Sequence, residues 1–204
     1  MKVYKLLIIL FILSSCQIVD NIDLAYYFEP NIPNIEIYKI DSTVKRDSKG
    51  KLRYNNELFS GYLVQKNATG QLLVKTGFVE GLEEGDMLGF YPNGDKRYIR
   101  PYVHGEKHGT HQGWYPSGQL QFQYHFEMGL SVGNHRDWFP DGSPLQDMNY
   151  VAGHHFGTQK VWRADGKIRS NYVIRENGKR YGLMGIKRCT KIDTKTQKLD
   201  PYKG

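Results

Sequence analysis

One segment of the chain, between Gly109 and Gly129, reads GTHQGWYPSGQLQFQYHFEMG. Its residues alternate between apolar and polar on both sides of Pro116-Ser117-Gly118, a pattern typical of two strands joined by a turn. Proline presets φ at the first corner of such a turn, serine suits the second, and glycine adopts the left-handed third position. The segment therefore predicts a β-hairpin with a three-residue loop, in which Tyr115 pairs with Gln119.

This register also assigns each side chain to one face of the hairpin, because successive residues of a strand point to opposite faces. The apolar face consists of Trp114, Leu120, Phe122, Tyr124 and Phe126. The other face is polar and carries His111 and His125. We therefore expect the tryptophan on the apolar side of the sheet and the histidines on the solvent side.

Aromatic residues recur along the chain with a period of 24 residues. One column contains Phe90, Trp114, Trp138 and Trp162, and a second contains Tyr102, Phe126 and Tyr150. Nineteen of the 22 glycines lie between Gly61 and Gly182, most of them at the same spacing. Self-similarity at a fixed period marks a repeat architecture. The seven aromatic residues are our candidate binding face. The tryptophan column either packs as core or lines an open groove, and only a groove makes it a binding surface.

The repeats predict an all-β fold, an extended antiparallel meander of about five 24-residue hairpins. Successive hairpins are expected to connect through five-residue turns, such as Gly105 to Gly109. We divide the chain into a signal peptide at 1–15, a tether and N-terminal segment at 16–44, the repeat array at 45–185, and a C-terminal cap with a basic tail at 186–204.

The composition agrees with a strand-rich, folded chain. Of its 204 residues, 24% are charged and 39% are hydrophobic, which excludes both a polytopic membrane protein and a disordered charged tail. Aromatic residues reach 13% and suit strands. The formal charge of +7 is moderate, and nucleic acid is not an expected partner of an exported protein.

The N-terminus resembles the signal peptide of a bacterial lipoprotein. Residues 6–13 are all apolar, and this run is shorter than the roughly 20 residues that span a bilayer. It ends in Leu13-Ser14-Ser15-Cys16, which resembles the lipobox, whose cysteine becomes the acylated first residue. The resemblance implies a membrane anchor at Cys16 and a location in the cell envelope. In such lipoproteins an Asp next to the cysteine favours retention in the inner membrane, so Gln17 favours the periplasmic side of the outer membrane.

Four turn segments resemble a known repeat family. They are Phe90-Tyr91-Pro92-Asn93-Gly94, Trp114-Tyr115-Pro116-Ser117-Gly118, Trp138-Phe139-Pro140-Asp141-Gly142 and Trp162-Arg163-Ala164-Asp165-Gly166. They are similar to the MORN repeat, and more narrowly to the variant class found in proteins labelled YwqK-family antitoxins. The resemblance covers residues 45–185 and implies protein–protein contacts and membrane proximity.

The sequence contains no catalytic or phosphate-binding motif, such as Gly-x-Ser-x-Gly, His-Glu-x-x-His or a Walker loop. We therefore predict no catalytic residues, no cofactor and no enzyme activity. His111, His125 and His135 are weak metal candidates, because all three are expected on the polar face of consecutive strands. Exposed histidines of this kind are usually only solvated.

Together these features predict a non-enzymatic, lipid-anchored envelope protein whose repeat array binds or scaffolds another envelope protein. One alternative is envelope metal handling, through the three histidines or through Cys189 with Met184. Another is a glycan-active enzyme on the aromatic surface, which requires a pair of carboxylates in a cleft. The oligomeric state does not follow from the sequence.

Overall fold

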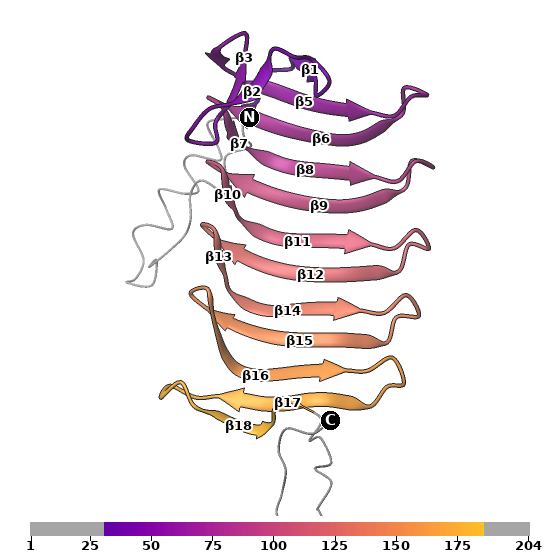
Figure 1. Cartoon of the computed structure of the whole chain (residues 1–204), viewed down its shortest axis with the longest axis vertical. Coiled ribbons are helices and arrows are strands. Elements are labelled where there is room, and N and C mark those ends of the chain that lie inside the picture. Colours follow the sequence, from indigo (N-terminus) through magenta and orange to yellow (C-terminus); the bar gives the residue numbers. More distant parts are fainter. Residues whose placement is uncertain (1–30, 186–204) are drawn as a thin grey trace, which may run out of the picture.

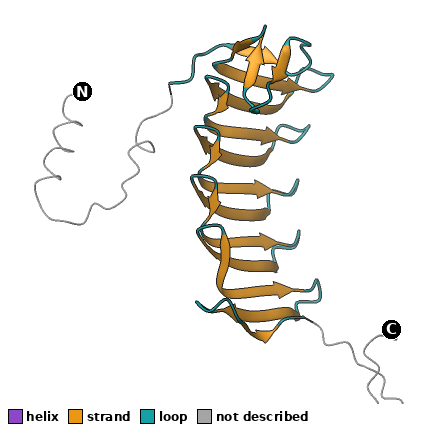
Figure 2. Ribbon diagram, turned by 60° about the vertical axis from the view of Figure 1, so that its left-hand side comes forward, coloured by secondary structure: helices purple, strands orange, loops and turns teal. Residues whose placement is uncertain are grey.

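The computed structural model describes residues 31–185, and these form strands and turns (Figure 1). The main sheet has 15 strands, and its principal order is β1-β5-β6-β8-β9-β11-β12-β14-β15-β16-β17-β18. Neighbours in this order are antiparallel, except that β1 runs parallel to β5. The predicted all-β meander is confirmed, and Figure 2 shows its hairpins stacked in one column.

Five hairpins build the array. They are β5 (Gly61–Lys66) with β6 (Leu72–Val79), β8 (Gly85–Phe90) with β9 (Lys96–Val103), β11 (Gly109–Trp114) with β12 (Leu120–Glu127), β14 (Gly133–Trp138) with β15 (Pro144–Val151), and β16 (His154–Trp162) with β17 (Ile168–Ile174). A last strand, β18 (Arg180–Leu183), pairs with β17.

The loop at the tip of each hairpin has the predicted geometry. The amide of Tyr115 donates to the carbonyl of Gln119 at 2.9 Å, and the amide of Gly118 donates to the carbonyl of Tyr115 at the same distance. Gly118 has φ +82°, in the left-handed region that glycine enters without strain. The three-residue loop is therefore confirmed, together with the pairing of Trp114 and Leu120.

The connections between hairpins differ from the predicted five-residue turns. Each is a two-residue turn with positive φ at both positions, as at His104 (φ 50°) and Gly105 (φ 85°). This is the turn type whose twist matches the flanking strands, and it lets the chain pair once more before the next hairpin begins. The extra pairs form the short strands β7 (Leu82–Glu83), β10 (Glu106–Lys107) and β13 (Leu130–Ser131).

These turns also stack along the array. The amide of Gly105 donates to the carbonyl of Glu83 at 2.8 Å, and the amide of Gly129 donates to the carbonyl of Lys107 at 2.8 Å. The same contact joins Gly153 to Ser131 at 2.9 Å. The turns thus add a backbone ladder that fixes each hairpin on the one before it.

The predicted faces of the sheet are confirmed for the tryptophans, which share one face, and for His111 and His135, which lie on the other. They are wrong for Phe122, Tyr124, Phe126 and His125, because every hairpin contains a β-bulge that a regular alternation does not predict. In β11 and β12, Trp114 pairs with Leu120 but Gly113 pairs with Phe122, so Gln121 is left over. One extra residue reverses the alternation of all side chains beyond it. The bulged residues recur every 24 positions, and they are Leu73, Arg97, Gln121, Leu145 and Arg169.

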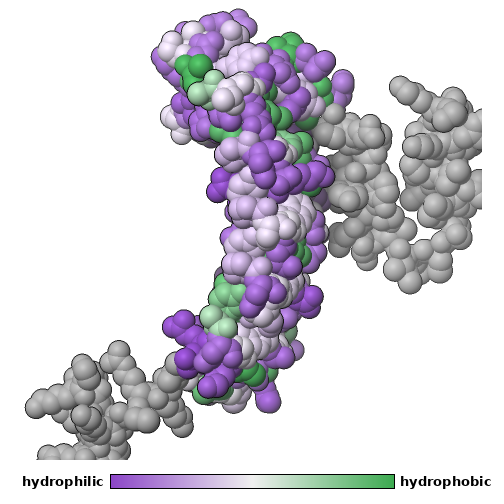
Figure 3. All heavy atoms as spheres, turned by 90° about the vertical axis from the view of Figure 1, so that its right-hand side faces the viewer, coloured by the Kyte–Doolittle hydropathy of each residue, from purple (hydrophilic) through white to green (hydrophobic). Residues whose placement is uncertain are grey.

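The N-terminal end of the array is closed by a small cap. The cap consists of β1 (Glu36–Tyr38), which pairs with β5, and of a three-stranded sheet, β2 (Val44–Arg46), β3 (Leu52–Tyr54) and β4 (Glu57–Leu58). Ile37, Leu52 and Phe59 form a buried cluster with Phe78 of β6. Figure 3 shows the array from its edge as a narrow column that is wider at this end.

The cap includes part of the predicted tether, because β1 and the first residue of β2 belong to residues 16–44. The predicted signal peptide, with Cys16 after it, and the tail with Cys189 lie outside the described residues. Between residues 31 and 185 the structure contains no helix with the length and apolarity needed to span a bilayer.

Candidate functional site

One face of the main sheet carries a continuous layer of rings, which we call the ring face. Its rings include Tyr98, Tyr102, Phe122, Tyr124, Phe126 and Tyr150. The register places His111 opposite Tyr124 and His135 opposite Met148, so both histidines belong to this face as well. The cap sheet packs on Phe78 of the first hairpin, but no second sheet covers the later hairpins up to residue 185, and there the rings shield the sheet themselves.

His111 and His135 are buried within this layer, with 3% and 6% of their surface exposed. The centroid of the His111 ring lies 5.5 Å from that of Tyr102 and 4.7 Å from that of Phe126. The His135 ring lies 5.2 Å from Phe126 and 4.5 Å from Tyr150. The expectation of solvent-exposed histidines is therefore wrong for these two, because the bulge brings the aromatic side chains to their side of the sheet.

Both histidines connect neighbouring hairpins through a hydrogen bond. Nε2 of His111 lies 2.9 Å from the carbonyl oxygen of Pro101, and Nε2 of His135 lies 2.7 Å from that of His125. A carbonyl oxygen only accepts, so Nε2–H is the donor in both cases. Gln159 holds the same repeat position and donates through Nε2 to the carbonyl of Asn149 at 2.9 Å. The position therefore requires a side-chain donor and not a histidine as such.

Burial also keeps these imidazoles neutral. Desolvation lowers the pKa of His111 from 6.5 to about 4, although its hydrogen bond to Pro101 acts in the opposite direction. Desolvation likewise lowers the pKa of His135. At neutral pH both rings are therefore uncharged parts of the aromatic layer.

The three metal candidates do not come together. His125 lies on the opposite face, where its Nδ1 is 3.1 Å from Oγ1 of Thr110. His111 and His135 each use Nε2 for a carbonyl. Among residues 31–185, no three His, Cys, Asp or Glu side chains lie close enough to hold a metal ion. Each of the three histidines therefore contacts a protein group of its own in the described part of the chain, and they share no ion.

Two glycines make room for rings on this face. Gly89 pairs with Tyr98, and Gly113 pairs with Phe122. A Cβ atom at either glycine would overlap the ring of its partner, so each ring leans over the backbone of the neighbouring strand. The missing side chain is thus what allows the ring to cover the sheet.

A cation lies between these two rings. The guanidinium of Arg100 is 4.5 Å from the Tyr98 ring and 5.6 Å from the Phe122 ring, within the range of a cation–π contact. Nζ of Lys107 lies 5.0 Å from the Phe126 ring. Neither residue belongs to the candidate site predicted from the sequence. Arg100 is nevertheless detectable as a charge in a column whose other members include Tyr124, Met148 and Tyr172.

A polar cluster adjoins the rings at the next repeat. The hydroxyl of Tyr124 donates to Oδ1 of Asp137 at 2.5 Å, and the amide of Gln146 donates to Oδ2. Burial, and then this hydrogen bond, raise the pKa of Tyr124 well above its usual range. Asp137 is the one acidic residue in this cluster, which therefore lacks the second carboxylate of a glycosidase.

The three tryptophans and Phe90 lie on the opposite side, which we call the tryptophan face. Each lies on the first strand of its hairpin, between the level of the bulge and the loop, and all four are half-buried. The hydroxyls of Tyr91 and Tyr115 donate to the carbonyls of Trp114 and Trp138 at 2.8 and 2.9 Å. The seven aromatic residues of the candidate binding face are thus divided between the two faces, and Tyr102, Phe126 and Tyr150 remain on the ring face.

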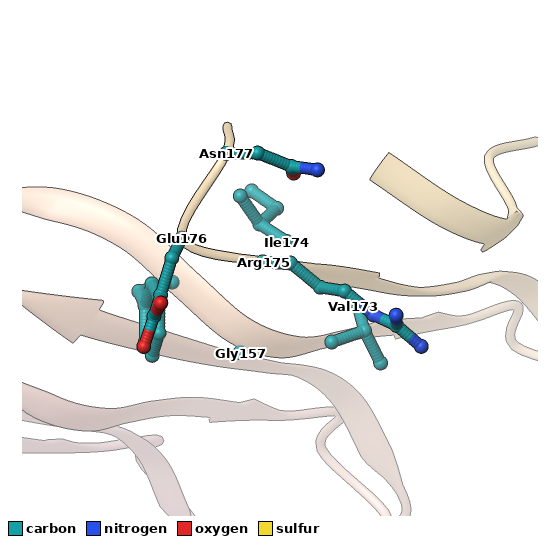
Figure 4. Close-up of a pocket in the computed structure, with 7 residues that line it drawn as sticks. Gly157, Val173, Ile174, Arg175, Glu176 and Asn177 are labelled. Carbon is teal, nitrogen blue, oxygen red and sulfur yellow. The ribbon is translucent and has the colours of Figure 1, made fainter. Parts of the chain in front are cut away.

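A pocket of about 480 Å³ lies at the C-terminal end of the array, between β16 and the turn after β17 (Figure 4). Its lining residues are Phe156, Gly157, Val173, Ile174, Arg175, Glu176 and Asn177. In Figure 4 the side chains of Arg175 and Glu176 extend away from each other. Glu176 is the one acidic residue in this lining, so the pocket offers no pair of carboxylates for hydrolysis.

Comparison with known families supports the repeat assignment. Residues 83–104 and 107–128 match the model of the MORN repeat variant. These segments contain the hairpins β8/β9 and β11/β12, which carry Arg100 and most of the ring face, and Lys107 of β10. No curated protein matches the chain. The MORN resemblance is therefore confirmed for these two repeats, and such repeats suggest a general role in binding or scaffolding.

Proposed function

We propose that the chain is a non-enzymatic scaffold protein of the bacterial cell envelope, anchored by an acylated Cys16, whose repeat array binds another envelope protein. The observation that supports binding most directly is the ring face. Its rings remain only half-buried along three repeats, although a monomer rarely leaves a large apolar surface in contact with water.

Rigidity also favours a scaffold. Neighbouring hairpins are joined by strand pairing, by the turn ladder and by the His111 and His135 hydrogen bonds. An array fixed in three ways presents its surface with little loss of conformational entropy on binding. The carboxylate arrangement of a hydrolase is missing from the ring face and from the C-terminal pocket within residues 31–185.

The anchor rests on Leu13-Ser14-Ser15-Cys16 and on the apolar run before it. Gln17 favours the periplasmic side of the outer membrane. An antitoxin acts in the cytoplasm, so the role that the YwqK label suggests is not part of this proposal.

Replacement of the two cysteines one at a time tests the anchor. Cys16→Ala is expected to release the protein from salt-washed membranes, because the acyl chains attach to this residue. Cys189→Ala is the matched control and is expected to leave the protein in the membrane fraction. Retention of the Cys16→Ala protein after the wash contradicts the anchor.

A photo-crosslinking residue tests the binding surface. Placed at Tyr102 on the ring face, it is expected to trap one defined partner in native membranes. Placed at Ser117 in an exposed hairpin loop, it is expected to trap none. Equal crosslinking from both positions, or none from Tyr102, contradicts the proposed role of the array.

A further inference from the structure

Arg100 and Lys107 form a pair of cations on the ring face, on both sides of one aromatic residue. Lys107 pairs with Tyr102 across β9 and β10, and Arg100 is two residues from Tyr102 on the same face of β9. Both contact rings of the next hairpin, Phe122 and Phe126. The two charges therefore lie among rings of β9 and β12.

Neither charge is neutralised within residues 31–185. Arg100 and Lys107 make contacts with rings there but no ion pair or side-chain hydrogen bond. Glu83, the acidic side chain close to Tyr102, is bound by Arg46 at 2.5 Å. A guanidinium that is half-buried among rings has lost part of its hydration, so an anion that reaches it gains more than it would at an exposed site.

The far end of the same surface has the opposite charge. Asp137 lies three strands beyond β9 in the sheet, opposite Phe122 across β12 and β14. Its oxygens accept hydrogen bonds from Tyr124 and Gln146. Because both donors are neutral, the negative charge is not compensated by them. The surface thus runs from two cations, across Phe122 and Tyr124, to one carboxylate.

We infer that the ring face binds an extended peptide segment of a partner protein, whose glutamate or aspartate side chains meet Arg100 and Lys107 and whose apolar residues lie on Phe122 and Tyr124. This inference rests on the proposed binding function and specifies the partner for it. The occupant is acidic at one end only, because Asp137 repels a carboxylate at the other end. Neighbouring strands are about 4.8 Å apart, so the surface from β9 to β14 suits several residues of an extended chain better than a single small anion.

The test measures fluorescence anisotropy of a labelled peptide with the purified full-length chain in detergent. The peptide has three glutamates followed by alternating valine and threonine, and in a second peptide lysines replace the glutamates. The first is expected to bind and the second to bind at least tenfold more weakly. Equal binding of both peptides, or no binding of the first at about 1 mM, overturns the inference.

Charge-removing variants locate the contact. Arg100→Gln and Lys107→Gln are each expected to weaken binding of the acidic peptide by about tenfold or more, because a hydrogen bond to a charged group is lost. Arg136→Gln is the matched control, since Arg136 lies on the tryptophan face and pairs there with Asp147 at 3.3 Å. Lys107 is exposed, so its variant tests the contact even if Arg100→Gln fails to fold. If Lys107→Gln binds the acidic peptide as tightly as the wild-type chain, and a folded Arg100→Gln does so as well, the inference is overturned.

Two competitors separate other anions from the peptide. Inorganic phosphate at matched ionic strength is expected not to displace it, and phosphatidylserine vesicles are expected not to bind through Arg100 and Lys107. Displacement by phosphate, or vesicle binding that these variants abolish, assigns the cations to another ligand and overturns the inference. If Tyr102 crosslinks a partner in membranes and Arg100→Gln does not affect it, the proposed function stands and the inference fails.

Discussion

Acidification is expected to destabilise the repeat array through the buried histidines. The unfolded chain binds a proton at His111 near its ordinary pKa of 6.5, whereas the folded chain binds it only near pH 4. The unfolded state therefore takes up the proton first as the pH falls. The stability that neutral His111 contributes is complete above about pH 6.5 and is lost as the pH falls towards 4.

The magnitude follows from the size of the shift. A change of one pKa unit corresponds to about 1.4 kcal/mol, so the full shift of His111 sets an upper limit of about 3 kcal/mol. The ring is 3% exposed, but no second layer covers this face and nearby water screens the charge. We therefore expect a loss of about 1–2 kcal/mol in the free energy of unfolding between pH 7 and pH 4.5 from this residue.

The repeat itself provides the variant for the assay. Gln159 donates to a carbonyl from the position equivalent to His111, so His111→Gln is expected to keep the hydrogen bond and to remove the titration. Urea unfolding of both proteins at pH 7 and pH 4.5 gives the difference directly, because the other titratable groups are present in both. His154→Gln, at an exposed histidine, is the control and should behave as the unmodified chain does.

The wild-type chain is expected to lose about 1–2 kcal/mol more than His111→Gln over this pH range. Identical pH dependence of the two proteins refutes the placement of His111 in a desolvated ring layer. A large loss of stability by His111→Gln already at pH 7 refutes the claim that the position needs only a donor.

Local backbone and ring geometry determines the cost of three further substitutions. Gly118→Val is expected to cost more than about 1 kcal/mol, since φ there is +82° and a β-branched residue is strained; an unchanged melting temperature contradicts the loop type. Gly113→Ala is expected to cost about 1–3 kcal/mol because its Cβ overlaps the Phe122 ring, and the smaller side chain of Phe122→Leu should relieve part of that cost in the double variant. Tyr115→Phe is expected to cost about 0.5–1.5 kcal/mol in urea unfolding through loss of the bond to the Trp138 carbonyl, whereas Phe139→Leu, one repeat later, removes no hydroxyl and serves as the control.

The period and the loop chemistry could be predicted because both depend on local residues. Glycine at 118 and proline at 116 determine the hairpin tip, and the 24-residue spacing of the tryptophans requires a repeat. Neither signal depends on how the side chains pack against one another, and the structure agrees with both.

The faces could not be predicted in the same way, because one unpaired residue reverses the alternation. Gln121 has no turn signature of its own, and it is polar like the residues that a regular strand would place on the solvent side. The column Met87, His111, His135 and Gln159 contained the missing information. Methionine at that position argues for a buried site, in which histidine and glutamine act as donors.

The most direct test of this architecture is a nuclear Overhauser measurement between side-chain rings in solution. The structure predicts strong cross-peaks from His111 to Phe126 and from His135 to Tyr150, whose ring centroids are 4.7 and 4.5 Å apart. It predicts none between His111 and His125, which lie on opposite faces of the sheet. A cross-peak between His111 and His125, with none from His111 to Phe126, would contradict the register and with it the ring face on which the proposed binding depends.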